Sequence, residues 1–537
     1  MSVVRLPEVI SISEEQLQET AGQFGVSIPK HDVEAYRILL SGLDEAAVAI
    51  AAEEDYLPPL DLQRFPRENV HRPVANEFNA WAYKVKITST KKEDLNGVLS
   101  GKTILIKDNI NIGKVPSLFG TDVINPGSII PEYDATVVTR VLKAGATIVG
   151  KGACENFSMS PSSFTNAYAQ VHHPLEPGFN AGGSSSGCAA LLAAGKVDLA
   201  IGGDQGGSIR VPASYCGLVG LKPTFGLIPY TGIASLASIV DHTGPMTRTV
   251  LDNALLLGVL AGSDGYDDRQ IGLPQPIPDY VSELSKYSSH PATAIKGFKI
   301  GIIKESFDMA GLDDRVSEKV KAAAHAFAKL GDNVTVEEVS VPIHKLAPAI
   351  WTIATRQGFS EQGVTGQNPL RFGVHDAALN VALSSWTQEM FDKVAIKNPA
   401  VTNALLGGRY IKNKYPGLTD KALNLARKLK DTYDSLFDTY DVLITPCAPT
   451  PANYYIFDEQ DDIMTKISKA VGTTQNTTPF NISGNPALSV PIALLPAVEK
   501  PEIKLPIGMQ IVGKSFDELS ILKAAYAWEQ SLSWKEF

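Results

Sequence analysis

The sequence predicts an α/β protein with a central mixed sheet, and three observations support this fold class. Short β-prone runs alternate with helical patterns from about residue 76 onward. The composition is that of an ordinary globular protein, with 44% hydrophobic and 20% charged residues among 537. The sequence shows neither an internal repeat nor a low-complexity tract. This length allows two to four domains, or one large layered core with additions.

Residues 1–75 are expected to form a helical N-terminal extension. Ser13 and Gln16 have the spacing of a capping box, which predicts the start of a first helix. After Pro29 a second helix is predicted by apolar residues that recur on one helical face, namely Val33, Tyr36, Leu40, Leu43 and Ala47. The Pro-rich segment 56–66 is the expected linker. Two interpretations stay open: the extension packs on the main core, or it forms a dimer interface.

Residues 76–537 are expected to form the α/β domain. The predicted strands are 103–110, 147–151, 199–203, 299–304, 334–339, 442–446, 487–493 and 509–513. The predicted helices that follow strands are 135–144, 186–194 and 316–330. This alternation favours a layered core with a mixed sheet over an all-β sandwich.

Charge and composition exclude several classes of function. The chain has 48 Lys and Arg against 58 Asp and Glu, and it lacks a cluster of five or more basic residues. Nucleic acid is therefore not expected as a partner, because phosphate binding needs concentrated positive charge. No apolar run approaches the 18 residues of a membrane span, and the N-terminus lacks a signal-peptide pattern. With only four scattered cysteines, we expect a soluble protein of the reducing cytoplasm.

Two Gly/Ser-rich runs between residues 180 and 220 are the densest unusual feature. They are NAGGSSSGCAA at 180–190 and IGGDQGGSIRVPAS at 201–214. Glycine lets successive backbone N–H groups converge on one oxygen atom, and serine hydroxyls can attack a carbonyl or relay a proton. Both runs adjoin apolar segments, so they lie at the ends of core elements, where α/β proteins place their sites. We therefore predict a catalytic site here.

A serine nucleophile needs a base, and the residues alone leave two interpretations open. Ser185 lies in a G-x-S-x-G pattern at 183–187, which is weak evidence for a nucleophile elbow because a loop precedes it. Its base would be one of four histidines, none of which lies in a motif: His172, His173, His242 and His375. The other candidate base is Lys107, at the end of the apolar run 103–106, where burial would lower its pKa. A single lysine at a strand end more often extends into solvent.

Together these segments resemble the amidase signature family of serine hydrolases. The resemblance runs from ILIKDN at 104–109 through both Gly/Ser runs to TPFNISGNPALSVPIA at 478–493 and LPIGMQIVG at 505–513. It covers about 76–537, and the family's two serines lie 24 residues apart, as Ser184 and Ser208 do. Within the family, the chain is most similar to amidases associated with nitrile hydratases. Those carry a helical N-terminal extension used in dimerisation, so the resemblance implies a layered α/β/α fold and a homodimer.

The resemblance also implies a role for each residue of the site. Ser208 would be the nucleophile, Ser184 a bridging serine that follows a cis peptide, and Lys107 the base. The oxyanion hole would consist of the backbone N–H groups of Gln205, Gly206, Gly207 and Ser208. The supporting residues would be Ser185, Asp204 and Arg210. The family uses no metal or organic cofactor, and this sequence has no set of residues with metal-ligand spacing.

The implied reaction is hydrolysis of a small carboxylic amide to the acid and ammonia through an acyl-enzyme. The sequence departs from the commoner GGSSGGSAA run at Ser186 and Cys188, and Gln205 stands where Thr or Ile is frequent. Two alternatives stay open: a urethanase acting on ethyl carbamate, and a glutamine-hydrolysing subunit of a tRNA amidotransferase. The acyl preference is not predicted, although candidates for its pocket are Phe157, Met159, Phe164, Trp351 and Tyr410.

Overall fold

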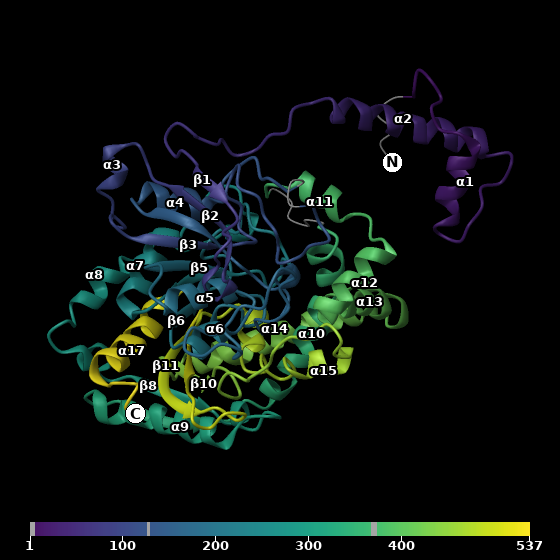
Figure 1. Cartoon of the computed structure of the whole chain (residues 1–537). Coiled ribbons are helices and arrows are strands. Elements are labelled where there is room, and N and C mark those ends of the chain that lie inside the picture. The colour runs from purple at the N-terminus through teal and green to yellow at the C-terminus, as the bar shows by residue number, and fades with distance from the viewer. Residues whose placement is uncertain (1–5, 126–128, 367–372) are drawn as a thin grey trace. The chain divides into compact units, whose positions relative to one another are not determined.

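The computed structural model of the chain describes residues 6–125, 129–366 and 373–537 (Figure 1). It divides into two compact units, Met1–Pro58 and Pro59–Phe537. The smaller unit is shorter than the expected extension 1–75. The reason is that β1 (Glu68–His71) pairs with β2 (Trp81–Ile87) in the sheet of the larger unit.

The smaller unit consists of α1 (Glu14–Gly22) and α2 (Val33–Ala51). The Gln16 N–H donates to Ser13 Oγ at 3.1 Å, and the Ser13 N–H donates to Gln16 Oε1 at 2.8 Å, so the predicted capping box is confirmed. On α2, three apolar side chains seven residues apart are exposed: Tyr36 (46%), Leu43 (65%) and Ile50 (75%). This unit therefore presents an apolar stripe to solvent along one helix.

The larger unit is built on one twelve-stranded mixed sheet with the order β1-β2-β4-β3-β5-β7-β6-β11-β12-β10-β8-β9. Its other strands are β3 (Thr103–Lys107), β4 (Thr147–Gly152), β5 (Leu199–Gly203), β6 (Val219–Lys222), β7 (Thr243–Thr247), β8 (Lys299–Ile303), β9 (Thr335–Val339), β10 (Val442–Pro446), β11 (Ala487–Pro496) and β12 (Lys504–Val512). Strand β3 is parallel to β4 and β5, and β8 is parallel to β9 and β10. The remaining neighbours are antiparallel, which confirms the predicted mixed sheet.

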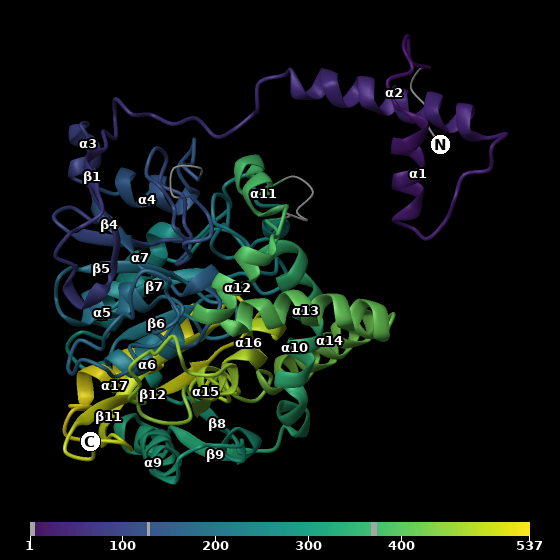
Figure 2. The same ribbon diagram turned by 45° about the vertical axis from the view of Figure 1, so that its right-hand side comes forward.

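Helices cover both faces of this sheet (Figures 1 and 2). The helices of the larger unit are α3 (Lys92–Leu95), α4 (Thr136–Lys143), α5 (Ser186–Ala193), α6 (Arg210–Cys216), α7 (Val250–Leu260), α8 (Tyr280–Ser285), α9 (Asp314–Leu330), α10 (Ala347–Gly358), α11 (Ala377–Leu383), α12 (Gln388–Lys397), α13 (Pro399–Lys414), α14 (Leu418–Leu436), α15 (Ile463–Ser468), α16 (Thr478–Ser483) and α17 (Glu518–Ser531). The group α10, α13 and α14, which lies side by side in Figure 2, was not predicted.

Alternation along β3 decides which face carries the site. Ile104 and Ile106 pack in one hydrophobic cluster with α4, α7, α9 and α17. Leu105 packs in a second cluster with α5 and α6. Because successive strand residues point to opposite faces, Lys107 lies on the same face as Leu105, toward α5 and α6. Both Gly/Ser runs lead into these two helices and include their first residues, so the fold brings the runs to Lys107.

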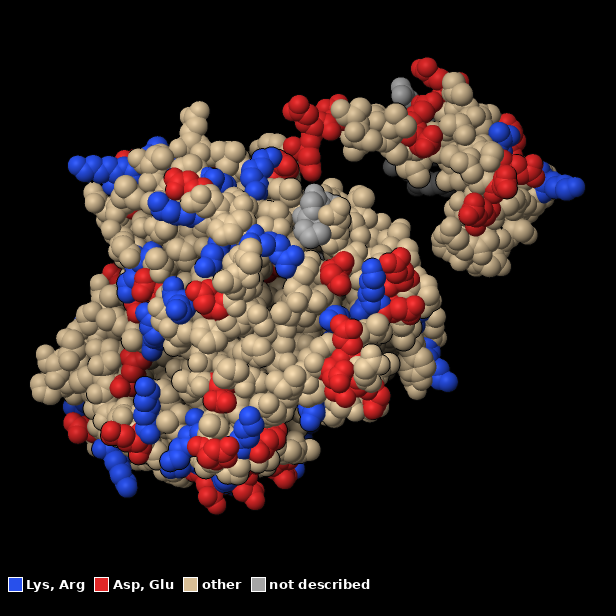
Figure 3. Space-filling model, viewed as in Figure 1, with Lys and Arg blue, Asp and Glu red and all other residues tan. Residues whose placement is uncertain are grey.

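The surface offers both signs of charge. On the face seen in Figure 3, Lys and Arg side chains alternate with Asp and Glu side chains. Among the described residues, no helix combines the length and the apolar composition that crossing a bilayer requires.

Candidate active site

Lys107, the last residue of β3, is fully buried. Its Nζ lies 2.8 Å from Ser184 Oγ and donates to the Gly203 carbonyl at 3.3 Å. Burial lowers the pKa of Lys107, and more distant acidic groups only partly oppose this shift. In its neutral form, the amine can accept the Ser184 proton along the same 2.8 Å contact. The prediction of a buried lysine is confirmed, and the solvent-exposed alternative is wrong.

Ser184 is buried and follows a cis peptide bond between Gly183 and Ser184. Only glycine fits at position 183, because a Cβ atom there would lie 1.9 Å from the Ser162 carbonyl oxygen. The Glu155 N–H donates to the Ser184 carbonyl at 3.3 Å. These contacts hold the backbone while the hydroxyl points to the lysine.

Glu155 is a buried carboxyl group that the sequence reasoning missed. It accepts hydrogen bonds from Ser186 Oγ at 2.8 Å, and from the Thr165 N–H at 2.7 Å and Oγ1 at 2.6 Å. Burial raises the pKa of Glu155 to about 7, although these hydrogen bonds and Lys107 oppose the shift. Ser186, one of the two departures from the commoner run, thus ties the start of α5 to this carboxyl. A single acidic residue three positions after the end of strand β4 was the available signal.

Asp204 and Arg210 form a fully buried ion pair at 2.8 Å. The Asp204 carboxylate also accepts from the N–H groups of Gly207 at 2.8 Å and Ile209 at 3.1 Å. Burial alone would raise the pKa of Asp204, but the Arg210 guanidinium outweighs it and holds that pKa well below its usual range. The pair therefore fixes the turn between β5 and α6, which contains Ser208.

Arg210 also connects this turn to the C-terminal part of the chain. It donates to the Thr477 carbonyl at 3.0 Å, to Asn481 Oδ1 at 2.7 Å and to Gln510 Oε1 at 2.6 Å. Because the guanidinium group is planar, its N–H donors fix both the distance and the direction of each acceptor. The turn is thus held from β12 and α16 as well as from its own carboxylate.

The four expected oxyanion-hole amides do not lie in equivalent settings. The Gly207 N–H is engaged with Asp204, whereas no acceptor in the described part of the chain faces the N–H groups of Gln205, Gly206 or Ser208. Trp351 Nε1 donates to the Gln205 carbonyl at 2.9 Å. This carbonyl and the Gly206 N–H belong to the same trans peptide group, in which C=O and N–H point in opposite directions. The Gly206 N–H is therefore directed away from Trp351. Three amides beside the half-buried Ser208 are free to bind a substrate oxygen.

Ser185 is buried, and its hydroxyl contacts the backbone of β5. It donates to the Gly203 carbonyl at 3.3 Å and accepts from the Gly203 N–H at 3.3 Å. The candidate histidines contact backbone groups, His172 at Gly178, His173 at Tyr215 and Leu175, and His242 at Val240, while His375 is exposed. In the described residues, none of the four bonds a serine hydroxyl. This arrangement does not support the nucleophile-elbow interpretation.

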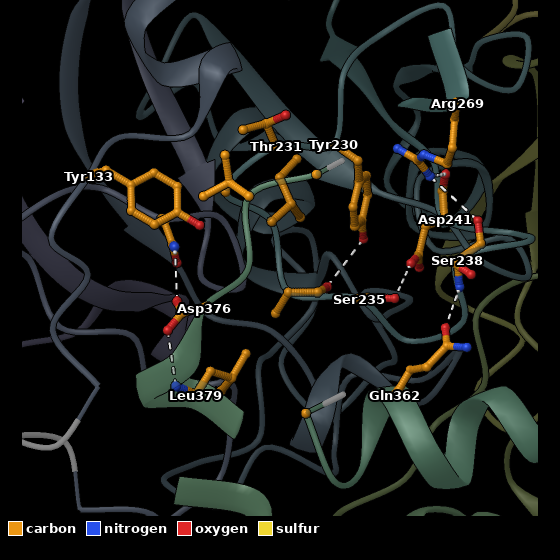
Figure 4. A pocket seen from close by; sticks show the side chains of 17 residues that line it. Tyr133, Tyr230, Thr231, Ser235, Ser238, Asp241, Arg269, Gln362, Asp376 and Leu379 are labelled. Atoms are coloured by element: carbon orange, nitrogen blue, oxygen red, sulfur yellow. Dashed lines mark hydrogen bonds between the residues drawn. The ribbon is translucent and has the colours of Figure 1, made fainter. Parts of the chain in front are cut away.

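A small apolar pocket lies next to the segment after Lys107. Its lining includes Asn109, Phe119, Ile124, Phe157 and Leu236. It shares Ala234, Ser235, Gln362 and Leu379 with a neighbouring pocket. Figure 4 shows this second pocket, with Tyr133 and Asp376 on one side and Tyr230, Asp241 and Arg269 on the other.

The candidate acyl-pocket residues fall in different places. Phe157 lines the apolar pocket, and Trp351 lies against Gly206, 3.0 Å from where a Cβ would be. Met159 is half-buried and packs against hydrophobic clusters beside the pocket. Phe164 packs edge-on against Tyr455, and Tyr410 is 56% exposed. Sequence alone could not separate these cases, since each is an apolar residue in a polar context.

Comparisons with known proteins show the family to which the chain belongs. The family model described as Amidase matches residues 67–522. This chain belongs to the amidase signature family. It is 36% identical over 519 residues to the enantioselective amidase of Rhodococcus rhodochrous, covering 95% of this chain and 93% of that relative. This chain is therefore an amide C–N hydrolase.

Other members of the family resemble this amidase in sequence and fold. It is 37% identical over 434 residues to a glutamyl-tRNA(Gln) amidotransferase subunit of Exiguobacterium sibiricum, covering 80% of this chain and 84% of that one. The solved structure of the corresponding Thermotoga maritima protein has a TM-score of 0.65 at 27% identity, covering 85% and 88% of the two chains. The peptide amidase of Stenotrophomonas maltophilia has a TM-score of 0.61 at 25% identity, covering 81% and 83%.

Proposed function

We propose that this amidase hydrolyses small carboxylic amides to the acid and ammonia, with Ser208 as nucleophile, Ser184 as proton relay and Lys107 as base. The observation that carries the proposal is the fully buried Lys107 Nζ at 2.8 Å from Ser184 Oγ. Among the described residues this amine has no ion-pair partner, so burial acts on its pKa without a salt bridge to offset it.

Acylation begins when Ser208 Oγ bonds to the amide carbon. Its proton passes to Ser184 as the Ser184 proton passes to neutral Lys107. The carbonyl oxygen becomes an oxyanion beside the amides of residues 205, 206 and 208, each such donor contributing about 3–4 kcal/mol. When the C–N bond breaks, the proton returns through Ser184 to the nitrogen, and ammonia leaves.

Deacylation uses the same groups in reverse. Water attacks the acyl carbon while Ser184 and Lys107 take one of its protons. The C–O bond to Ser208 breaks, the proton returns to Ser208 Oγ, and the carboxylic acid leaves. The cycle consumes one amide and one water and needs no further reactant.

The test is alanine substitution of the three residues in the full-length chain. Ser208→Ala, Lys107→Ala and Ser184→Ala should each lower kcat for a primary amide by at least about 1000-fold, by loss of nucleophile, base or relay. Thermal denaturation checks that the fold survives. Ser385→Ala and Lys143→Ala, at exposed positions, are the matched controls and should keep wild-type kcat.

A second result would overturn the assignment of the base. If Lys107→Ala keeps near-normal turnover while His242→Ala loses it, a histidine is the base and Ser185 becomes the nucleophile candidate. Mass spectrometry of the enzyme quenched during turnover locates the acyl group. An adduct on the peptide that contains Ser208 supports the proposal, and one on the peptide that contains Ser185 contradicts it.

Two alternative activities stay open: hydrolysis of ethyl carbamate and hydrolysis of glutamine. Ethyl carbamate has the same carbonyl and releases the same ammonia, so a urethanase would use the same groups. The similarity to amidotransferase subunits makes glutamine the third substrate to test. A panel of aliphatic amides, aromatic amides, ethyl carbamate and glutamine ranks them by kcat/KM. We expect the amides to rank first.

We also propose a cytoplasmic homodimer that associates through residues of the helical extension. The exposed stripe Tyr36, Leu43 and Ile50 on α2 supports this, because a second copy of the chain would bury it. The cysteines are unpaired and buried, in keeping with a reducing compartment. Light scattering should give twice the chain mass, and Leu43→Ser with Ile50→Ser should give the monomer. A monomeric wild type contradicts the proposal.

A further inference from the structure

Two buried side-chain oxygens near Lys107 lack hydrogen-bond donors. They are Asn109 Oδ1 and Gln205 Oε1, on residues that are only 1% and 3% exposed. Within the described part of the chain neither atom has a partner. Asn109 is two residues beyond Lys107, and Gln205 begins the glycine turn before Ser208. A buried acceptor without a donor is unfavourable, so two of them on side chains that reach the same segment, Tyr230–Ala234, point to a ligand that donates.

The surrounding hydrogen bonds determine which way the two side-chain amides face. Gln205 Nε2 donates to Tyr230 Oη at 2.8 Å, and the Tyr230 hydroxyl donates to the Ala234 carbonyl at 3.3 Å. Asn109 Nδ2 donates to the same carbonyl at 3.4 Å. Because a carbonyl only accepts, both NH₂ groups must face this segment, and both oxygens face away from it. Figure 4 shows the Tyr230 hydroxyl pointing toward the chain beside Ser235.

The Gln205 side chain borders the same small space as the Lys107 amine. A Cβ atom placed on Gly203 would lie 3.5 Å from Lys107 Nζ and 3.8 Å from Gln205 Nε2. In the proposed reaction, Lys107 and Ser184 return a proton to the departing nitrogen. The leaving group must therefore lie on the lysine side of the carbonyl, in the space that the Gln205 side chain borders through its Nε2 atom.

We propose that Asn109 and Gln205 form an acceptor pair for the N–H groups of the leaving nitrogen. The pair would select substrates with an unsubstituted –NH₂, namely primary amides and carbamates with a free amino group, over esters with the same acyl group. An ester has no N–H on its leaving atom, so both oxygens would stay unpaired when it binds. The inference rests on the proposed function and adds to it the chemistry of the leaving group.

Tyr230 is the positioning residue for this pair. Its hydroxyl accepts from Gln205 and donates to Ala234, so it makes only one orientation of the Gln205 amide favourable. Tyr230→Phe would remove that constraint and let the amide turn its NH₂ into the site. A donor there would face the donor of the substrate, which disfavours the amide.

The experiment compares kcat/KM for a primary amide and for the methyl ester of the same acid. Gln205→Met removes the acceptor and should lower the amide-to-ester ratio about 10- to 100-fold. Gln205→Glu retains acceptor oxygens and should keep more of the ratio than Gln205→Met, and Tyr230→Phe should lower it. The matched control is Gln170→Met, since both ends of the Gln170 amide are paired with backbone groups of Tyr455 and Phe457. Its ratio should equal that of the wild type.

A ratio for Gln205→Met within threefold of the wild type overturns the inference, because a merely structural role lowers both reactions together. Where ester turnover is too slow to measure, calorimetry compares the binding of both compounds to Ser208→Ala. In this background, Gln205→Met should selectively weaken binding of the amide. Ser208→Ala separates the two proposals. If it keeps amide turnover, the proposed function fails; if it is inactive and the ratio is constant, only the acceptor pair fails.

Discussion

The buried pair Asp204–Arg210 allows a prediction about both stability and catalysis. Arg210→Met keeps the volume and the apolar stem but removes the guanidinium, which makes hydrogen bonds to Asp204, Thr477, Asn481 and Gln510. The substitution leaves the Asp204 carboxylate without its counter-ion, and both side chains are 0% exposed. Breaking a buried pair in this way costs about 3–5 kcal/mol.

The size of the larger unit determines what a melting experiment will show. The entropy of unfolding is about 2.1 cal/mol/K per residue, so the unit Pro59–Phe537 has an unfolding entropy of about 1 kcal/mol/K. Arg210→Met should therefore lower Tm by only about 3–5 °C, and Asp204→Asn should do the same. Since Asp204 also accepts from the Gly207 N–H, kcat should fall as well, because the amides of the proposed oxyanion hole lose their support.

The double variant Asp204→Asn/Arg210→Met tests the reasoning, with Tm measured by scanning fluorimetry at one fixed scan rate. Removing both charges together leaves neither unpaired, so its loss in Tm should be close to that of one single variant. If the stability loss of the double variant equals the sum of the two single losses within about 0.5 kcal/mol, the pairing is refuted, because independent sites are additive to that accuracy. Lys143→Ala, a surface substitution, is the control and should not shift Tm.

Three further predictions follow from the site. Burial holds the pKa of Lys107 below its ordinary value of 10.5, and in the proposed mechanism the neutral amine is the active form. We therefore expect kcat/KM to rise with pH and to level off below 10.5; a rate that falls from pH 6 to 9 contradicts this. Burial raises the pKa of Glu155 from 4.5 to about 7, so the folded state prefers the protonated carboxyl, and its stabilisation is present below pH 4.5 and lost as pH rises through 7. Glu155→Gln should flatten this part of a Tm–pH curve, and an unchanged slope argues against it. Gly183→Ala would place a Cβ 1.9 Å from the Ser162 carbonyl, so activity should fall more than 100-fold with a lowered Tm, whereas wild-type values would show that the turn relaxes.

Several elements follow from local pattern alone. Strand β5 covers the predicted residues, and α5 begins at the predicted Ser186, because an apolar run of strand length and a small-residue helix start are local properties. The capping box at Ser13 needs only a three-residue spacing. Strand β7 (Thr243–Thr247) escaped prediction, since Gly244 and Pro245 disfavour a strand, and only its pairing with β5 and β6 makes it one.

The sequence by itself determined which residue types the site would contain: a strand-end lysine and two serines within Gly/Ser runs. The tertiary structure alone decided that the lysine is buried 2.8 Å from Ser184, that Glu155 accepts from Ser186, and that Arg210 reaches Gln510 across 300 residues. It alone left the oxygens of Asn109 and Gln205 without a partner among the residues that the structure describes. The physical reason is that burial, and the partner a polar atom finds, depend on contacts between segments far apart in the chain, which local spacing does not record.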